Sequence, residues 1–169
     1  MKIRKAEPKD AKKLAQIHID SWKIAYKGLV PDNILEELDY DKRENGFKDA
    51  LEKELEETYI AEDKNDFFGF VTIGKCRDED LDCSNVAELW GIYLDPKYWR
   101  RGIGSSRFSF AEDKFISRGY HEYVLWAFED NVRGDLFYRA MGHIPDGARK
   151  ILKRGKDLNV IRYKKVLPN

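Results

Sequence analysis

Apolar and polar residues follow a helical spacing over much of the first third of the chain. Residues 3–6 are expected to form a short strand, and Glu7-Pro8-Lys9-Asp10 is typical of a helix start because proline is tolerated in a first turn. Apolar residues then recur every three or four positions up to Gly28. The buried face of this helix is expected to carry Ala11, Leu14, Ala15, His18, Trp22 and Ala25. A short helix over 31–38 and a charged helix over 41–55 follow. The apolar positions of the charged helix are Phe47, Leu51 and Leu55.

Runs rich in aromatic and β-branched residues occupy the middle of the chain. Residues 58–61 and 67–73 are separated by the turn-like Asp63-Lys64-Asn65-Asp66, which predicts an antiparallel hairpin. Residues 87–94 predict a further strand. Asp95-Pro96 ends that strand because proline cannot continue a hydrogen-bonded ladder.

Helices and strands are expected to alternate in the last third. A helix that ends at Gly119 has its apolar residues on one face, namely Phe108, Ala111, Phe115 and Ile116. A strand over 122–127 follows, and then a helix capped by Asn131 and closed by Gly142. Two strands complete the chain, over 148–152 and 160–166, joined through 153–156.

Together these elements predict a mixed sheet of about seven strands flanked by helices, an α/β (α+β) fold. The chain has 169 residues, of which 42% are hydrophobic, so it can bury a full core. We therefore expect one domain over residues 1–169.

The stretch Tyr98-Trp99-Arg100-Arg101-Gly102-Ile103-Gly104-Ser105 lies between the 87–94 strand and the following helix. Glycines let the backbone approach a ligand closely, and the positive end of a helix attracts anions. The residues alone leave two alternatives open, a phosphate-binding loop and a plain turn between strand and helix.

Composition excludes several classes of protein. Lys plus Arg and Asp plus Glu both number 31, so no net positive field favours nucleic acid. Cys76 and Cys83 form no zinc pattern, the three histidines show no metal spacing, and no apolar stretch approaches membrane length. We expect a soluble, cytoplasmic protein with no metal. The acidic run at 78–82 is either a solvated loop or a docking surface for cationic substrates.

A set of ordered motifs resembles the GNAT family of N-acetyltransferases. The motifs are Leu94-Asp95-Pro96, Arg101-Gly102-Ile103-Gly104, Glu129-Asp130-Asn131-Val132-Arg133 and Phe137-Tyr138-Arg139-Ala140-Met141-Gly142. The resemblance implies a mostly antiparallel sheet with helices on both faces and acetyl-CoA as acyl donor, bound between two parallel strands at 86–94 and 122–127. The glycine loop would hold the pyrophosphate.

The resemblance also implies the residues that contact the donor. They are Ile92, Tyr93, Leu94, Trp99, Arg100, Arg101, Gly102, Ile103, Gly104, Ser105, Asn131 and Tyr138. Main-chain groups of Ile92 and Leu94 would pair with the thioester and pantetheine arm as an added strand does. Some positions depart from the family pattern. Trp99 replaces an Arg or Gln, His143 replaces a Phe, and Gly134 replaces an Ala.

Amine attack on a thioester needs a group that removes the ammonium proton and a group that meets the departing thiolate. Glu88 is the candidate base, because strand alternation places it on one apolar face with its neighbours Val86, Trp90, Ile92 and Leu94. The alternative is a structural pair between Glu88 and an arginine. By resemblance Tyr138 is the candidate acid, whereas a tyrosine on a helix is by default a core residue.

The acceptor is expected to be a primary amine on a small molecule, a polyamine or a peptide N-terminus. Trp22, Tyr26, Glu88 and Trp90 are the candidate acceptor-binding residues, with core packing as the alternative for the aromatic ones. A catalytically silent acyl-CoA sensor is the competing hypothesis. A monomer or a homodimer would fit either.

Overall fold

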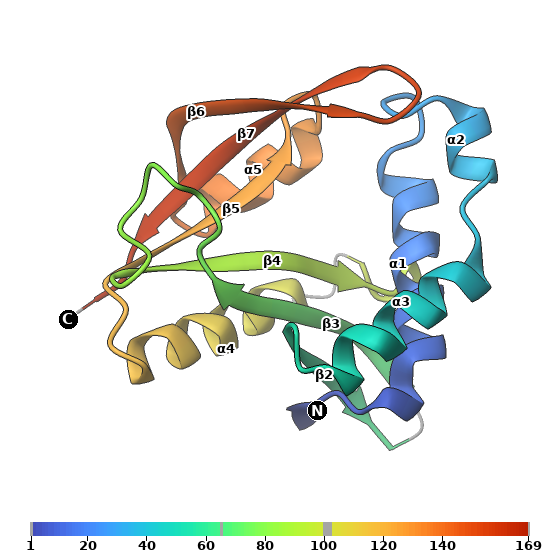
Figure 1. Ribbon diagram of the computed structural model, residues 1–169, viewed down its shortest axis with the longest axis horizontal. Helices are drawn as coiled ribbons and strands as arrows, with labels where there is room; N and C mark the ends of the chain where they lie inside the picture. Colours follow the sequence, from blue (N-terminus) through green and yellow to red (C-terminus); the bar gives the residue numbers. More distant parts are fainter. Residues whose placement is uncertain (1, 65, 100–102, 169) are drawn as a thin grey trace.

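The computed structural model describes residues 2–64, 66–99 and 103–168, with 103–108 described by their backbone alone, and forms a seven-stranded sheet flanked by helices (Figure 1). The strand order is β1-β2-β3-β4-β5-β7-β6, and all neighbours are antiparallel except the parallel pair β4 and β5. The strands are β1 (Lys2–Lys5), β2 (Glu57–Asp63), β3 (Asp66–Lys75), β4 (Val86–Leu94), β5 (Glu122–Phe128), β6 (Ile144–Lys153) and β7 (Asp157–Val166). The helices are η1 (Pro8–Asp10), α1 (Ala11–Ala25), α2 (Asp32–Glu36), α3 (Tyr40–Glu52), η2 (Pro96–Tyr98), α4 (Ile103–Ser117) and α5 (Val132–Ala140), where η marks a 3₁₀ helix. The predicted fold class is confirmed.

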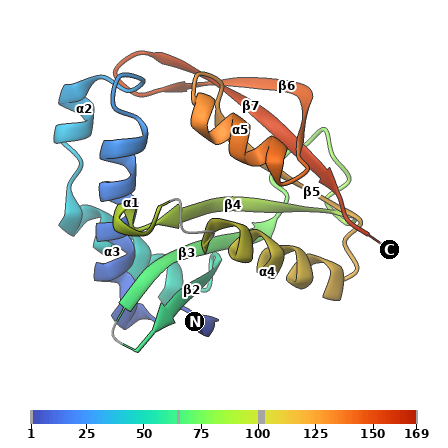
Figure 2. The ribbon, with the colours of Figure 1, turned by 180° about the vertical axis from the view of Figure 1, so that it is seen from behind.

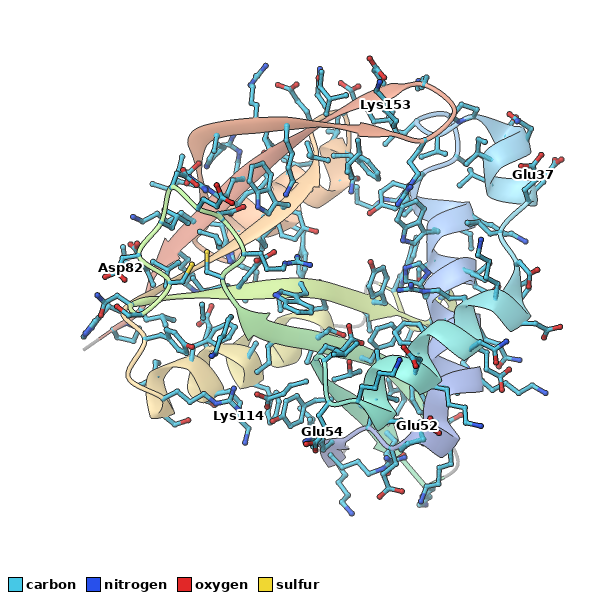
Figure 3. The ribbon with its side chains drawn as sticks, in the orientation of Figure 1. Glu37, Glu52, Glu54, Asp82, Lys114 and Lys153 are labelled. Atoms are coloured by element: carbon cyan, nitrogen blue, oxygen red, sulfur yellow. The ribbon has the colours of Figure 1, made fainter. Side chains whose placement is uncertain are left out.

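Different helices cover the two faces of the sheet. Helices α4 and α5 lie on one face, in front of the strands in Figure 2, and their core includes Val71, Leu89, Phe115, Tyr123 and Leu125. Helices α1 and α3 lie on the other face, where the core includes Leu14, Ile17, Phe47, Ile60 and Phe70. The labelled charged side chains Glu52, Glu54 and Lys114 point away from the sheet (Figure 3).

The last two strands are longer than predicted. β6 begins at Ile144, ahead of the predicted start at 148, and β7 begins at Asp157, ahead of the predicted start at 160. The β6 register shifts between Pro145 and Arg149, so the strand continues through residues that are typical of a turn.

Two residues expected on buried helix faces are exposed. Helix α3 ends at Glu52, and Glu54 adopts a left-handed backbone with φ of 52°, which turns the chain before Leu55. Leu55 is consequently 61% exposed. Ile116, in the last turn of α4, is 39% exposed. The predicted burial of these two side chains is wrong.

The parallel strands β4 and β5 separate along their length. They pair only where β4 residues 86–88 face β5 residues 122–124, and beyond this point they diverge (Figure 1). The β6–β7 turn and α2 meet at the wide end, since a Cβ added to Gly155 would lie 2.6 Å from Ile34. The gap is thus bounded by two strands and closed at one end.

A β-bulge at Trp90 changes which β4 residues share a face. The register with β3 shifts here and leaves Trp90 as the extra residue. Ile92 therefore packs into the same core cluster as Leu89, while Glu88 lies on the opposite face. The prediction that Glu88, Trp90 and Ile92 share one face is wrong.

The acidic run at 78–82 is folded onto β7 by a cluster of Arg162, Asp78, Asp80 and Asp146, here called the Arg162 cluster. Arg162 is 4% exposed and donates hydrogen bonds to Asp146 at 2.6 Å, to Asp80 at 2.7 and 2.8 Å, and to Asp78 at 3.2 Å. Trp126 Nε1 donates to Asp78 at 2.9 Å. The carboxylates of Asp78 and Asp80 are therefore engaged in structural contacts.

Gly69 on β3 is expected not to tolerate alanine. Its φ is +150°, and an added Cβ would lie 2.1 Å from the Tyr93 carbonyl oxygen and 2.9 Å from Leu94 Cα. Backbone strain and overpacking should lower the free energy of unfolding of Gly69→Ala by about 2–3 kcal/mol in urea denaturation. Gly46→Ala on α3 is the control, because nothing lies within 4 Å of its added Cβ. Wild-type stability of Gly69→Ala would contradict the close β3–β4 approach.

Candidate active site

A cavity of about 450 Å³ lies where β4 and β5 diverge. Its lining includes many of the residues predicted to contact donor or acceptor, namely Trp22, Tyr26, Ile92, Tyr93, Leu94, Trp99, Asn131 and Tyr138. The structure thus brings together residues of α1, β4, α5 and their flanking segments. Ser21, Ala25, Arg133 and Phe137 also line it and were not predicted. For Ser21 and Ala25 the available signal was their spacing of four on the helix that carries Trp22.

The main chain of β4 turns an open edge toward this cavity. Asp95 N–H donates to the Phe68 carbonyl at 2.9 Å, and hydrogen-bonded and non-bonded pairs alternate along an antiparallel ladder. Leu94 and Ile92 therefore direct their N–H and C=O groups away from β3 and toward the gap. No part of β5 pairs with them. This edge can accept an extended ligand as an added strand.

The end of β4 is fixed by two hydrogen bonds to one carbonyl. Ser21 Oγ donates to the Leu94 carbonyl at 2.7 Å, and Trp99 Nε1 donates to the same oxygen at 3.0 Å. Both lone pairs of that oxygen are thereby used. At this end of β4, the main-chain groups that face the gap and remain for a ligand are the N–H of Leu94 and the N–H and C=O of Ile92.

Trp99 lies in the wall of the cavity with the Arg133 guanidinium 5.5 Å from its ring centroid. Its indole N–H makes a structural bond to β4, whereas the Arg or Gln that the resemblance implies at this position would offer charged or amide donors. Arg100, Arg101 and Gly102 lie outside the described residues. Of the predicted loop, the backbone of residues 103–105 forms the first turn of α4, where the helix presents unpaired N–H groups.

Tyr138 is positioned by contacts at both ends of α5. At the N-terminus, Asn131 caps the helix by accepting from Gly134 N–H at 3.0 Å, as the sequence predicts. At the C-terminus, the buried His143 donates from Nδ1 to the Tyr138 carbonyl at 3.0 Å. Burial lowers the pKa of His143 to about 4, so this ring is neutral at neutral pH. The Tyr163 ring packs 5.2 Å from the Tyr138 ring.

Three tyrosines line the cavity. Burial raises the pKa of Tyr138 to about 12, and it also raises the pKa of Tyr93 and of Tyr26. Within the described lining, Arg133 carries the only formal charge. Apart from Arg133, the described lining is therefore uncharged, with protonated tyrosines and no carboxylate.

Trp22 and Tyr26 combine core packing with cavity lining. Their rings meet edge to face at 4.8 Å, and Tyr26 meets Phe128 in the same way at 4.8 Å. His18 is 8% exposed and stacks on Trp22 at 5.5 Å. Burial lowers the pKa of His18 to about 3, so it is neutral at neutral pH. These aromatic rings form a rigid wall beside β4.

Glu88 lies outside the described lining of the cavity. It is 2% exposed and accepts hydrogen bonds from the Arg77 backbone N–H at 3.0 Å, from Arg77 Nε at 3.1 Å and from Arg77 Nη2. Trp90 packs against the same guanidinium, 4.2 Å from its ring centroid, and donates Nε1 to the Lys75 carbonyl. The structure thus contains the arginine pair that was the alternative to a catalytic Glu88. Trp90 lines a smaller neighbouring cavity.

Comparison with known proteins identifies this arrangement. The family model described as "Acetyltransferase (GNAT) family" matches residues 14–143. This chain belongs to the GNAT family. The match spans the cavity residues from α1 to α5, so the predicted family and the predicted class of enzyme, an N-acetyltransferase, are confirmed.

Two relatives of this GNAT protein are both named as N-acetyltransferases. The chain is 30% identical to "Uncharacterized N-acetyltransferase YuaI" of Bacillus subtilis over 82% of its own length and 77% of the relative. It is 27% identical to "Spermidine N(1)-acetyltransferase" of Thermoplasma acidophilum over 84% and 87%. A solved structure, the PaiA N-acetyltransferase of Thermoplasma acidophilum in complex with coenzyme A, is similar with a TM-score of 0.72, 22% identity and 98% coverage of both chains. This likeness supports the GNAT fold.

None of the described helices of this GNAT protein is both long and apolar enough to pass through a lipid bilayer.

Proposed function

We propose that this chain transfers the acetyl group of acetyl-CoA directly to a primary amine in a ternary complex. The observation that carries the proposal is the open edge of β4 at Ile92 and Leu94, facing a cavity that Tyr138 also lines. Family membership supports acetyl transfer, and the solved relative that holds coenzyme A supports the choice of donor.

The residues present fit the proposed donor. An extended pantetheine arm has the hydrogen-bonding groups needed to add to the Ile92–Leu94 edge. The cavity volume of about 450 Å³ leaves room for the arm beside the aromatic wall. The first turn of α4, next to the cavity residue Trp99, supplies backbone N–H groups and the positive end of a helix for phosphates.

The proposed chemistry needs a neutral amine. The amine nitrogen attacks the thioester carbonyl, a C–N bond forms, and the C–S bond breaks. Removing an ammonium from water into a cavity with few charges favours its neutral form, so the environment itself lowers the pKa of the acceptor. Water is the proposed acceptor of the ammonium proton before attack and of the second proton that the nitrogen loses once the C–N bond has formed. Tyr138 gives its proton to the departing sulfur and regains one from water.

A thiol-release assay over a panel of primary amines, combined with thermal shift, tests this function. Acetyl-CoA is expected to raise Tm, and at least one amine is expected to release free CoA in stoichiometric yield with acetylated product. A raised Tm without turnover of any amine would instead support a silent acyl-CoA sensor. An unchanged Tm would contradict donor binding.

Glu88→Gln separates a catalytic role of Glu88 from a structural one. We propose that Glu88 acts through its pair with Arg77, so the variant should lose about 1–3 kcal/mol of folding free energy through weakened charged hydrogen bonds. Its kcat should stay within about threefold of wild type, since loss of a general base costs about 10²-fold or more. Arg77→Gln is the matched partner and should behave alike. A hundredfold loss of kcat in Glu88→Gln alone would identify a base.

A further inference from the structure

A second cavity, of about 180 Å³, lies on the α3 side of the sheet. Its walls come from α3, β3, β4 and the residues that follow β3, and its polar lining includes Arg43, Glu56, Thr72 and Arg77. Tyr93 lines both this cavity and the main one. The two cavities therefore share a wall at the β4 segment where acyl transfer is proposed.

The charged side chains around the second cavity differ in whether they have a partner of opposite charge or a hydrogen bond. Arg77 is paired with Glu88, and Glu56 accepts a hydrogen bond from the Thr58 hydroxyl at 3.2 Å. Arg43 has no carboxylate within ion-pair distance in the described parts of the chain. Its guanidinium lies 4.3 Å from the ring centroid of Phe47, which forms part of the same cavity.

The positive charge of Arg43 acts toward the site. Burial is the main cause of the lowered pKa of His18, and the charge of Arg43 lowers this pKa further. Arg43 also acts to lower the pKa of Tyr93, but burial has the larger effect and raises that pKa overall. The His18 ring lies 4.7 Å from the Tyr93 ring. The cationic field of Arg43 thus reaches the wall that separates the two cavities.

Building on the proposed acetyl transfer, we propose that the acceptor is an amine that also carries a carboxylate, and that Arg43 binds this carboxylate in the second cavity. A guanidinium pairs with a carboxylate through two parallel hydrogen bonds, which fixes orientation as well as charge. The Thr72 hydroxyl in the same lining is engaged by the Thr58 hydroxyl at 2.9 Å, so Arg43 supplies the carboxylate contact. The amine end then extends past Tyr93 to the main cavity.

The same charges disfavour a polyamine acceptor. A polyamine keeps one or more ammonium groups besides the reacting nitrogen. The described linings of the two cavities contain three guanidinium groups, on Arg43, Arg77 and Arg133, and one carboxylate, on Glu56. The carboxylate of Glu88 is already paired with Arg77. An ammonium placed there would meet guanidinium groups and would find little carboxylate to pair with. On this point we expect the chain to differ from its relative named spermidine N(1)-acetyltransferase.

Matched acceptor pairs test the proposal. 6-Aminohexanoate with pentylamine, 5-aminopentanoate with butylamine, and lysine reacting at Nε with cadaverine differ only by the carboxylate, and spermidine is added as the polyamine. Wild-type kcat/KM is expected to be at least about tenfold higher for the acid of the preferred pair, as one charged hydrogen-bonded contact supplies. Arg43→Gln should remove this preference, mainly through KM. Lys48→Gln, a charge change elsewhere on α3, should preserve it.

The outcomes separate this inference from the proposed function. Preference for spermidine or for the decarboxylated amines would overturn the carboxylate site, as would an equal effect of Arg43→Gln on both members of a pair. If no acceptor of the panel is acetylated, calorimetry can measure the binding of the N-acetyl amino acids and the N-acetyl amines, with and without CoA. Their relative affinities then test the carboxylate site. CoA binding without preference for the acids overturns only the carboxylate site. Preference for the acids without CoA binding overturns only the proposed acetyl transfer.

Discussion

Tyr138→Phe is expected to lower kcat by about 10²–10³-fold, within the range for loss of a general acid. Burial raises the pKa of Tyr138 to about 12, so the hydroxyl remains protonated at neutral pH and can donate to a departing thiolate. Its ring is held by His143 and Tyr163, and phenylalanine keeps that packing. Binding of acetyl-CoA should therefore stay within about threefold of wild type, because only a bond made late in the reaction is lost. Steady-state kinetics and calorimetry measure the two quantities.

Tyr163→Phe is the matched control for Tyr138→Phe. It removes a β7 hydroxyl that donates to Asp135 of α5 at 2.6 Å, and Tyr163 lies outside the main-cavity lining. It should cost stability of about 1 kcal/mol and leave kcat unchanged. Because the pKa of Tyr138 is raised, its deprotonation should not lower wild-type activity below about pH 11. A Tyr138→Phe enzyme with wild-type kcat would contradict the proposed acid.

Arg162→Met is expected to lower the free energy of unfolding by about 3–5 kcal/mol at pH 7, the cost of leaving buried charges unpaired. The Arg162 side chain is 5% exposed, and its removal leaves Asp78 and Asp146 together at 13% and 16% exposure. Asp80→Asn, in the same cluster, should cost much less because Asp80 is 63% exposed. Urea denaturation of the three proteins measures the difference.

The Arg162→Met effect should depend on pH with a definite sign. In the wild type, the hydrogen-bonded Arg162 guanidinium lowers the pKa of Asp80, so this stabilisation is present above the ordinary aspartate pKa and is lost as pH falls below it. In the variant, the carboxylates of the cluster repel one another, and protonation removes this repulsion as the pH falls. The difference in unfolding free energy should therefore hold from pH 7 to about pH 4 and shrink as the pH falls further, below the ordinary aspartate pKa. A constant difference would contradict the Arg162 cluster.

Most helices and strands could be predicted because their signals are local. Pro8 near the start of the first helix, Gly119 after α4 and Asn131 at the cap of α5 are each determined by backbone conformation or by a neighbouring N–H. The start of β6 could not be predicted, since Pro145 within it is typical of a turn. Pairing with β7 overrides that local preference.

Contacts between distant residues set the limits of prediction at the site. The bulge at Trp90 arises from the register with β3, and it reverses the alternation on which the setting of Glu88 was based. Asp80 and Arg162 are 82 positions apart, so no local pattern links them. Tyr138 was predicted from a family motif, whereas Trp22 and Tyr26 were predicted separately as acceptor-binding residues, and the fold brings all three into one cavity lining.

We expect the donor to lie along the open edge of β4 with its sulfur at Tyr138, and a crystal structure of the complex with CoA tests this placement. It should show main-chain hydrogen bonds from Ile92 to the pantetheine arm and the thiol within hydrogen-bond distance of the Tyr138 hydroxyl. A thiol placed instead on the α3 side of the sheet, beside Glu88 and away from Tyr138, would contradict it.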